Sequence, residues 1–321
     1  PSMAAFILGG IRTGRKLLRC REFDIVNTHF ALPSGPVGAA LAQAGRLPNV
    51  LSVHGGDLYD PTKWLSPHRH GPLRSVVTHI VRRADVVVGQ SRNTIENLRR
   101  YYDQAPEAQL IPLGIPRPPR TSADREVLGV AADEFVMITI ARLVARKGID
   151  QLLTLLRRLD GTNARLVVIG GGPELESLRF QANALGIGSR VTFTGFLTEE
   201  KKTEWLAASD LYVSTTQHEG FGLVFLEAMA QGLPVVCYDH GGQTDFLAHG
   251  VNAMLLPLND LDAFEAAVRE LASDADTRAR IAARNRRDVE RYFIEACADR
   301  YEELFTEFAG QTHSVVSALR Q

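Results

Sequence analysis

The chain has 321 residues, 45% of them hydrophobic, which is enough for two α/β domains of ordinary size. Its three cysteines are widely spaced and form no CxxC pair, which argues against a disulfide scaffold and against a structural zinc site. No apolar run approaches the roughly 18 residues of a membrane span, and the sequence shows no secretory signal pattern. We therefore expect a cytoplasmic protein that is either soluble or peripheral to the membrane.

The net charge of −1 hides an imbalance between the two parts of the chain. Residues 1–120 hold 16 Lys and Arg against 8 Asp and Glu, a balance of +8, and the remainder holds 20 against 29, a balance of −9. The basic part is either an ordinary solvated surface or a face that meets an anionic membrane, a phosphorylated acceptor or an acidic polymer. Its cations do not alternate with aromatic residues, so we expect no nucleic-acid partner.

The first predicted element is a basic amphipathic helix from Met3 to Arg21. Pro1 and Ser2 precede it and look like a tag remnant ahead of the encoded start. We expect the helix to pack on a core, and an interfacial membrane helix is the alternative. Three short apolar runs rich in β-branched residues follow, at 24–30, 50–54 and 85–90. Each precedes a helical pattern, as in parallel strands buried on both faces. After the third run, Ser91 is a natural N-cap for a helix over 93–102.

Residues 110–120 (LIPLGIPRPPR) contain four prolines and predict an interdomain linker, because proline lacks a backbone donor and has a fixed φ. The alternating pattern then restarts. Five strands are predicted, at 135–141, 165–170, 191–194, 211–215 and 234–237. The helices predicted between them are at 149–159, 175–185, 199–208 and 223–231. Five strands with right-handed crossovers make a complete doubly wound domain.

Two more helices are predicted near the C-terminus, at 260–271 and 278–301, the second extending to 308. The expected architecture is α/β, with two Rossmann-like domains. We expect a partial N-terminal domain over 1–115 and a second domain over 116–292. Residues 293–321 are expected to form a helix that returns to the first domain, followed by a tail.

The most informative segment is residues 217–231, QHEGFGLVFLEAMAQ. A glycine turn and a helix start lie between Glu219 and Glu227; they are formed by Gly220, Phe221, Gly222 and Leu223. Glycines let the backbone approach a ligand closely, and free amides at a helix N-terminus attract phosphate oxygens. The two carboxylates can then hold opposite ends of an elongated ligand. The alternative is a plain turn with Glu219 as a favourable charge at the helix start.

A second segment, ARLVARKG at 141–148, follows the first strand of the same domain and offers Arg142 and Lys147. Both lie at the carboxyl end of a parallel strand, where open α/β sheets bind ligands. A forked guanidinium and an ammonium suit a diphosphate, although both could be ordinary surface cations. Further glycine turns follow other strands of this domain, at Gly170–Pro173, Gly195 and Gly241–Gly242. Such turns are by themselves weak indicators of a ligand site.

Taken in order, ARLVARKG, IGGGPELESL, VTFTGFL, HEGFGLVFLEAMAQGLPVV and the later GG resemble the retaining GT-B glycosyltransferases of family GT4. The resemblance covers nearly all of residues 110–310. The family's pair of glutamates, E-x7-E, is matched by Glu219 and Glu227. The resemblance implies a metal-independent transfer of a sugar from a nucleoside-diphosphate sugar, UDP- or GDP-linked, to a hydroxyl acceptor. That acceptor would be a glycan, a lipid-linked molecule or a small molecule.

The resemblance also implies roles for single residues. Arg142 and Lys147 would hold the diphosphate of the donor, Glu219 the hydroxyls of its sugar, and Glu227 the ribose. The amides of Gly220, Phe221, Gly222 and Leu223 would meet the sugar and the phosphates. The candidates near the base, within segments 170–173 and 193–196, are Gly171, Gly172, Pro173 and Phe196. No DxD-type metal motif is found, so the two cations would take the place of a metal ion.

The N-terminal part resembles the family only partly. Residues 53–57, VHGGD, are similar to its HGxD loop, which would place His54 in the interdomain cleft near the reacting sugar; a strand-end histidine is the alternative. Three predicted strands stand where six or more are expected. A truncated or misassigned start, a second chain that completes the domain, and dimerisation through the incomplete sheet each explain this. We favour the first and rank dimerisation second.

Three other functions compete with transfer. A glycoside hydrolase needs two carboxylates on either side of one bond, roughly 5–10 Å apart, and has no use for the cations. A nucleotide-sugar epimerase on the same fold would release an epimer or free sugar without an acceptor. A non-catalytic nucleotide-sugar-binding or partner subunit would bind the nucleotide without turnover.

Overall fold

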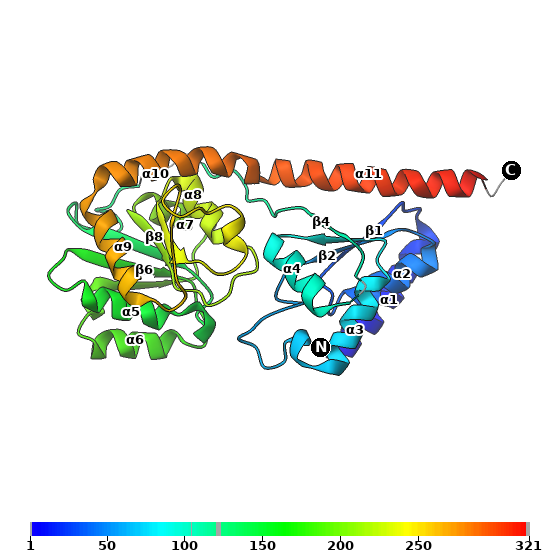
Figure 1. The fold of residues 1–321 in the computed structure, drawn as a ribbon, viewed down its shortest axis with the longest axis horizontal. Coiled ribbons are helices and arrows are strands. Elements are labelled where there is room, and N and C mark those ends of the chain that lie inside the picture. Colours follow the sequence, from blue (N-terminus) through cyan, green and yellow to red (C-terminus); the bar gives the residue numbers. More distant parts are fainter. Residues whose placement is uncertain (1, 104, 120–122, 319–321) are drawn as a thin grey trace. The chain divides into compact units, whose positions relative to one another are not determined.

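The computed structural model describes residues 2–103, 105–119 and 123–318, and side-chain surroundings up to residue 309. The chain divides into two compact units (Figure 1). Unit 1 takes the residues up to Gly114 and those from Ile294 onward, and unit 2 runs from Ile115 to Phe293.

Unit 1 holds a parallel sheet in the order β1-β2-β3-β4. Its strands are β1 (Val26–His29), β2 (Asn49–Val53), β3 (Val86–Gly89) and β4 (Ala108–Leu110). The prediction of three strands is wrong. The fourth has only three residues, and its last residue, Leu110, lies in the proline-rich segment that we interpreted as linker. The backbone groups of β4 pair with those of β3, and the sequence pattern does not reveal this pairing.

The helices of unit 1 begin with α1 (Met3–Cys20), which packs along α2 (Gly35–Gly45) but has no buried residue of its own. The others are α3 (Gly71–Arg82), α4 (Arg92–Tyr101) and α11 (Ile294–Ala318), with a short 3₁₀ turn, η1, at Pro67–Arg69. Ser91 caps α4 as predicted: its hydroxyl accepts a hydrogen bond from the amide of Thr94 at 3.0 Å.

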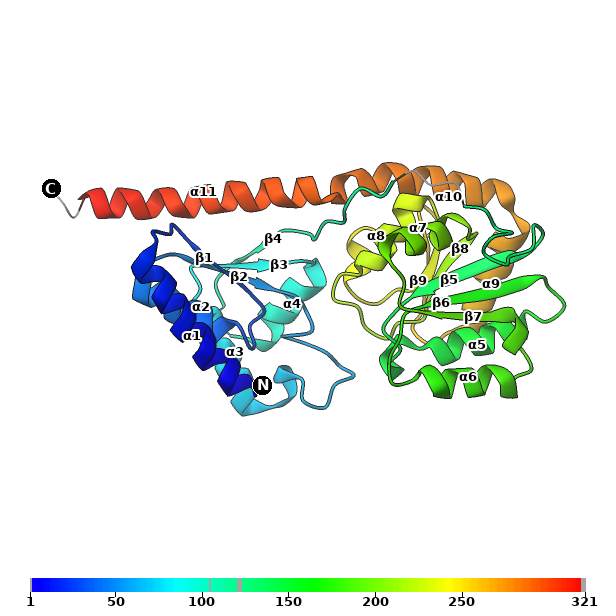
Figure 2. The same ribbon diagram turned by 180° about the vertical axis from the view of Figure 1, so that it is seen from behind.

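Both faces of the sheet in unit 1 are covered, because successive residues of each strand point to opposite sides. Val50, Val86 and Val88 form a core cluster with Leu304 of α11. Leu51, Val53 and Val87 face the other way and pack with residues of α3 and α4. Helix α11, at the C-terminal end of the described chain, therefore covers one face of a sheet formed near the N-terminal end (Figures 1 and 2).

Unit 2 holds a six-stranded parallel sheet in the order β10-β9-β8-β5-β6-β7. Its strands are β5 (Phe135–Ile140), β6 (Ala164–Ile169), β7 (Val191–Gly195), β8 (Leu211–Ser214), β9 (Val235–Tyr238) and β10 (Met254–Leu256). The first five match the predicted strands to within a residue or two. The prediction missed β10, which is only three residues long. This is the doubly wound strand order, and its switch point lies between β5 and β8.

Helices cover both faces of this sheet (Figures 1 and 2). They are α5 (Ile149–Arg158), α6 (Leu175–Ala184), α7 (Glu199–Ala207), α8 (Leu223–Gln231), α9 (Leu261–Ser273) and α10 (Ala275–Asp288). Short 3₁₀ turns add η2 (Ala145–Lys147), η3 (Gly188–Arg190), η4 (Gly242–Asp245) and η5 (Val289–Tyr292).

The single helix predicted over 278–301 is wrong, since α10 ends at Asp288 and α11 begins only at Ile294. The linker pairs with the interrupted segment. The amide of Ile115 donates to the carbonyl of Tyr292 at 3.0 Å, and Ile115 forms a parallel bridge with Phe293. The carbonyl of Tyr292 is therefore used by the linker at the point where a continuous helix would run.

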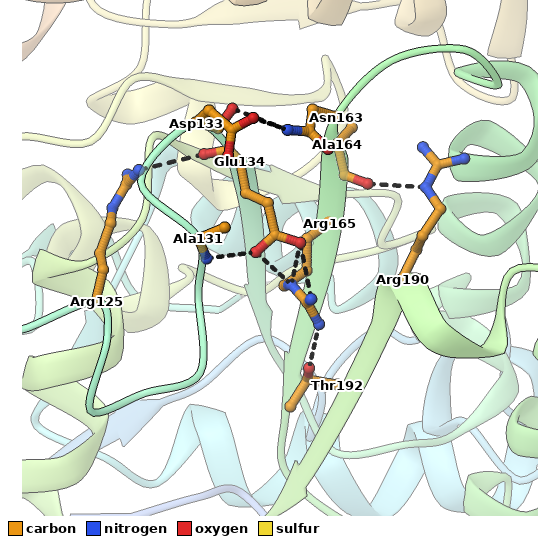
Figure 3. A network of polar contacts seen from close by, with 9 residues as sticks. All are labelled: Arg125, Ala131, Asp133, Glu134, Asn163, Ala164, Arg165, Arg190 and Thr192. Atoms are coloured by element: carbon orange, nitrogen blue, oxygen red, sulfur yellow. Dashed lines mark hydrogen bonds and ion pairs between the residues drawn. The ribbon is translucent and has the colours of Figure 1, made fainter.

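At the amino ends of β5, β6 and β7, a polar network ties the strands together (Figure 3). Glu134, just before β5, accepts hydrogen bonds from Arg165 of β6, with Nη2 to Oε1 at 2.7 Å, and Arg165 also donates to Thr192 of β7 at 3.3 Å. Asn163 donates to Asp133 at 2.6 Å in the same network. These residues hold the strands at the edge opposite the loops that carry the candidate site.

Candidate functional site

The candidate site of unit 2 lies where two loops leave neighbouring strands at the switch point, residues 141–148 after β5 and 215–222 after β8. Their backbones are joined: the amide of Gln217 donates to the carbonyl of Arg146 at 2.9 Å. Gly148 permits this approach. It has φ +63°, and a Cβ there would lie 2.5 Å from the carbonyl oxygen of Thr215.

The two loops are also linked by an ion pair. Lys147 Nζ lies 2.5 Å from Glu219 Oε2, and only 11% and 18% of these side chains are exposed. Two candidates from separate sequence motifs are thus in direct contact. Arg142 lies on the same loop as Lys147, is exposed, and has no ion pair with any other residue that the structure describes.

Helix α8 begins at the end of the second loop without a side-chain cap. Gly222 precedes its first residue, with φ +95°, and no side chain of the described residues accepts a hydrogen bond from the first-turn amides. The exposed Leu223 opens the helix. Uncapped amides at a helix start carry partial positive charge and form a binding place for an anion.

The side chain of Phe221 is not available to a ligand. It is buried and packs against Phe246 and Tyr292, with ring centroids 5.2 Å and 6.3 Å away. At this position only the backbone can face a bound molecule. The packing fixes the turn between Glu219 and α8.

The loop after β9 contacts the backbone of Glu219. The amide of Gly242 donates to the carbonyl of Glu219 at 2.8 Å, and a Cβ at Gly242 would lie 2.0 Å from the carbonyl oxygen of Gly220. Only glycine fits so close to another backbone. The Gly241–Gly242 pair predicted as a ligand turn therefore has at least this role in packing.

The glycine turn after β6 packs against the loop after β5 in the same way. A Cβ at Gly172 would lie 2.3 Å from the carbonyl oxygen of Leu143, and one at Gly171 would meet the ring of Phe196 at 2.7 Å. Phe196 is 84% exposed, and Pro173, two residues after Gly171, is exposed as well. The loops after β6 and β7 thus present an exposed aromatic ring next to a glycine backbone. A planar base can stack on such a surface.

Glu227 lies on α8 and faces α7. Its Oε1 lies 3.0 Å from Lys202 Nζ, while its Oε2 is buried and has no hydrogen-bond partner among the described residues. Burial raises the pKa of Glu227, and Lys202 opposes that rise. The carboxylate lines a pocket of about 180 Å³ between α7, α8 and the segment 115–119. Sequence reasoning missed Lys202, although its spacing from Glu199, three residues earlier in α7, indicates a shared helix face.

In unit 1, His54 belongs to a directed chain of hydrogen bonds across the carboxyl ends of β1, β2 and β3. Gln90 Nε2 donates to the carbonyl of His54 at 2.7 Å, so Gln90 Oε1 is the atom that faces His54 Nδ1 at 3.1 Å. An amide oxygen only accepts, so His54 carries its proton on Nδ1. His54 Nε2 then faces His29 Nδ1 at 3.0 Å, which makes His29 the donor when His54 is neutral.

The pKa of both histidines is lowered, by burial in each case and for His29 also by the nearby His54. The turn that carries His54 is held by Asp57, whose two carboxylate oxygens accept from the amides of His54 and Ala31 at 2.9 Å and 2.7 Å. Both ring nitrogens of His54 are thus occupied within unit 1. Sequence reasoning singled out His54 but missed its partners His29 and Gln90.

No group of three or more His, Cys, Asp or Glu side chains arranged to hold a metal ion is found in the part of the chain that the structure describes. None of the described helices combines the length and the apolar character that a membrane span requires.

The arrangement at the switch point can be compared with known proteins. Residues 121–288 match the family model described as glycosyl transferases group 1, and residues 2–117 match the model of glycosyltransferase family 4. The chain belongs to the group 1 glycosyltransferases. The resemblance drawn from the motifs is thereby confirmed at the level of the family, and the residues of the candidate site lie within the first of these matches.

Among curated relatives, a lipopolysaccharide core biosynthesis glycosyltransferase, LpsE of Rhizobium meliloti, is 34% identical over 57% of this chain and 53% of its own length. The GDP-mannose-dependent alpha-(1-6)-phosphatidylinositol monomannoside mannosyltransferase of Mycobacterium tuberculosis is 32% identical over 82% of this chain and 70% of its own. The chain thus spans between half and about two thirds of the length of these relatives.

Among solved structures, Anabaena HepE in complex with UDP superposes with a TM-score of 0.80 at 23% identity, covering 93% of this chain and 82% of that one. The same protein is also known in complex with UDP-glucose. This likeness confirms the expected fold, two Rossmann-like α/β domains of the GT-B type.

Proposed function

We propose that the chain transfers a sugar from a nucleoside-diphosphate sugar to a hydroxyl acceptor, with retention of the anomeric configuration and without a metal ion. The observation that carries the proposal is the joined loops at the switch point of unit 2. There the Lys147–Glu219 ion pair joins the two loops, and Glu219 lies on the loop that ends at the uncapped start of α8. A cation and free helix amides suit a diphosphate, and a carboxylate beside them suits sugar hydroxyls.

In the proposed reaction, the bond between the anomeric carbon and the diphosphate oxygen breaks, and the acceptor oxygen bonds to that carbon on the same face. The acceptor proton passes to the departing phosphate oxygen. Charge therefore develops on the diphosphate in the transition state. Lys147, Arg142 and the first amides of α8 supply positive charge for it, which is how fixed dipoles and cations lower a barrier.

The nucleoside half of the donor has its own candidate partners. Glu227 lines the pocket beside α7 and keeps acceptor capacity for ribose hydroxyls, and Phe196 offers a ring for the base. The base is proposed to be uracil or guanine. HepE binds UDP and the mycobacterial relative is GDP-mannose-dependent, and each of these supports one of the two choices.

For the acceptor we propose a molecule held at an anionic lipid surface, which unit 1 would contact peripherally. Helices α1, α2 and α3 lie side by side (Figure 2), and residues 25–56 and 61–84 contain no Asp or Glu. Helix α1 carries Arg12, Arg15, Lys16 and Arg19, and α3 carries Arg74 and Arg82. A pocket of about 490 Å³ with a mostly apolar lining lies between α2 and α3. Basic clusters beside apolar surface bind anionic lipid.

Vesicle co-sedimentation tests the lipid contact. The protein should pellet with phosphatidylglycerol vesicles at low salt, should be released at high salt, and should not pellet with phosphatidylcholine alone. Equal binding to both lipids, or to neither, contradicts the lipid contact and leaves the donor site unaffected.

Thermal shift with UDP, GDP and ADP, followed by their sugars, tests the donor site. One of UDP or GDP should raise the melting temperature of the wild type and not that of Lys147→Ala. Turnover with an alcohol acceptor, and retention in the NMR spectrum of the product, should follow. An epimer formed without acceptor would instead indicate an epimerase, and binding without any turnover a binding subunit. No response to any nucleotide contradicts the proposal.

A further inference from the structure

Lys202 stands between two carboxylates at the edge of the pocket that holds Glu227. Its Nζ lies 3.0 Å from Glu227 Oε1 on α8 and 2.7 Å from Glu199 Oε2 on its own helix. Only 14% of the Lys202 side chain is exposed, against 81% for Glu199. A lysine loses much side-chain entropy when it is held in one place. Because Glu199 is exposed and Glu227 is enclosed, we attribute the ordering of the Lys202 side chain to its contact with Glu227.

Glu227 has a buried carboxylate oxygen, Oε2, that is unusual because no residue that the structure describes meets its hydrogen-bonding capacity. Its Oε2 is buried without a hydrogen-bond partner among the described residues, and an unsatisfied buried acceptor is costly. A carboxylate can accept about four hydrogen bonds, of which Lys202 donates one. The group therefore has capacity for hydroxyl donors from a bound molecule, provided that it stays ionised and in place.

We propose that Lys202 is a positioning residue of the donor site: it holds Glu227 Oε1 so that the carboxylate is kept as an acceptor for the ribose hydroxyls. This inference rests on the proposed function. It goes beyond that proposal by assigning the preference for a ribonucleotide to a pair of residues on two helices rather than to Glu227 alone.

The charges around the pair set the direction of the pH effect. Burial raises the pKa of Glu227 and Lys202 lowers it, while Glu199 adds a smaller upward push. Glu200 of α7 and Arg117 of the segment before unit 2's sheet also line the pocket. Without Lys202 the opposition to burial is lost, so Glu227 takes up a proton at higher pH than in the wild type. A protonated oxygen donates a hydrogen bond and no longer accepts one there.

The test uses binding of UDP and of its 2′,3′-dideoxy analogue, or of GDP and its analogue where GDP is the nucleotide that binds. Calorimetry on the wild type should give a preference for the ribonucleotide of roughly tenfold or more, the size expected from hydrogen bonds to a charged group. Lys202→Met should lose most of this preference at neutral pH and regain part of it at alkaline pH. Lys202→Arg should keep it.

The neighbouring residue provides a matched control. Lys201 is 54% exposed and pairs with Glu204 at 2.7 Å on the same helix, so Lys201→Met should leave the preference unchanged. In a transfer assay, Lys202→Met should raise the KM for the donor with kcat within a few-fold of wild type, because ribose lies away from the reacting bond.

The outcomes separate the two proposals. If the wild type binds neither UDP nor GDP, the proposed function fails and this inference fails with it. If it binds, Glu227→Gln loses the ribose preference and Lys202→Met retains it at every pH, the role of Lys202 is wrong while the function stands. If Glu227→Gln also retains the preference, the ribose is held elsewhere and the inference is overturned.

Discussion

Lys147 Nζ and Glu219 Oε2, 72 residues apart in sequence, lie 2.5 Å apart at the switch point of unit 2. The pair joins the loops that follow the two central strands, β5 and β8. Since one partner can hold phosphate and the other sugar hydroxyls, a ligand between them would exchange part of this ion pair for contacts of its own. The bare pair also keeps each charge compensated while the site is empty of ligand.

Removing Lys147 should damage donor use more than folding. A hydrogen bond between charged groups contributes about 1.5–3 kcal/mol, so Lys147→Ala should lower kcat/KM for the donor sugar by roughly 10- to 150-fold. Initial rates with the nucleotide sugar identified by thermal shift measure this. Arg179→Ala provides the control, since among the described residues Arg179 forms an ion pair with the 81% exposed Glu176 alone. Equal losses in both variants would contradict the assignment.

Gly222→Ala should abolish phosphate binding at the start of α8. Gly222 has φ +95°, and a Cβ there would lie 2.5 Å from Phe225 Cδ2. Any residue with a Cβ at positive φ costs about 1–2 kcal/mol, and this one must also displace the aromatic ring. Gly161→Ala is the control, because Gly161 has φ +77° and open space around it. Both variants should melt earlier, and only Gly222→Ala should lose stabilisation by nucleotide.

Acid should weaken unit 2 through the network of Figure 3. The hydrogen bond from Arg165 holds the pKa of Glu134 below its ordinary value of 4.5. A carboxyl with a lowered pKa stabilises the fold above its unfolded pKa, and this contribution is lost as pH falls through the folded pKa. Urea unfolding between pH 7 and pH 3.5 should therefore lose less stability in Glu134→Gln than in the wild type.

Tryptophan fluorescence can follow that unfolding in unit 2 alone. The chain has two tryptophans, the exposed Trp64 and the buried Trp205 of α7, so Trp64→Phe leaves a buried reporter in unit 2. Glu176→Gln, at an exposed ion pair, should behave like the wild type. A Glu134→Gln variant with the wild-type acid sensitivity would show that the network does not carry this pH dependence.

The histidine chain of unit 1 should be visible as fixed tautomers. Long-range ¹⁵N NMR above pH 7 should show Nδ1–H for both His29 and His54, since Gln90 can only accept from His54. The pKa of each is lowered from 6.5, so the unfolded chain takes up protons first. Unit 1 should accordingly lose stability as pH falls below about 6.5, by hydrogen exchange of β2. Gln90→Leu should remove the tautomer preference of His54; unchanged spectra would contradict the assigned chain.

Most of the sheet in unit 2 could be predicted because its central strands are continuous β-branched runs between helices, a pattern that only buried parallel strands require. Strands β4 and β10 could not, because three residues such as Ala108–Leu110 carry no periodicity. The break at Phe293 was equally hidden, since neither proline nor glycine marks it and the segment that pairs with it, at Ile115, is far away in sequence.

The candidate site divides in the same way. Glu219, Lys147 and the glycine turn could be found because charged residues and glycines follow strands, where the topology brings loops together. Lys202 meets Glu227 only through the packing of α7 on α8, and His29 meets His54 only through the register of β1 and β2. Such pairs are set by tertiary contacts, and local sequence does not encode them.

The return of α11 to unit 1 bears on how the chain folds as it is made. Among the described residues, α11 supplies Leu304, Tyr301 and Phe305 to the side of the first sheet formed by Val50, Val86 and Val88, and these arrive only after residues from Ile294 onward leave the ribosome. Unit 2 is contiguous in sequence and can close its core before that moment. Most of unit 1 is therefore synthesised before unit 2, but unit 1 completes its packing after unit 2. In the interval, chaperones can bind its exposed valine surface.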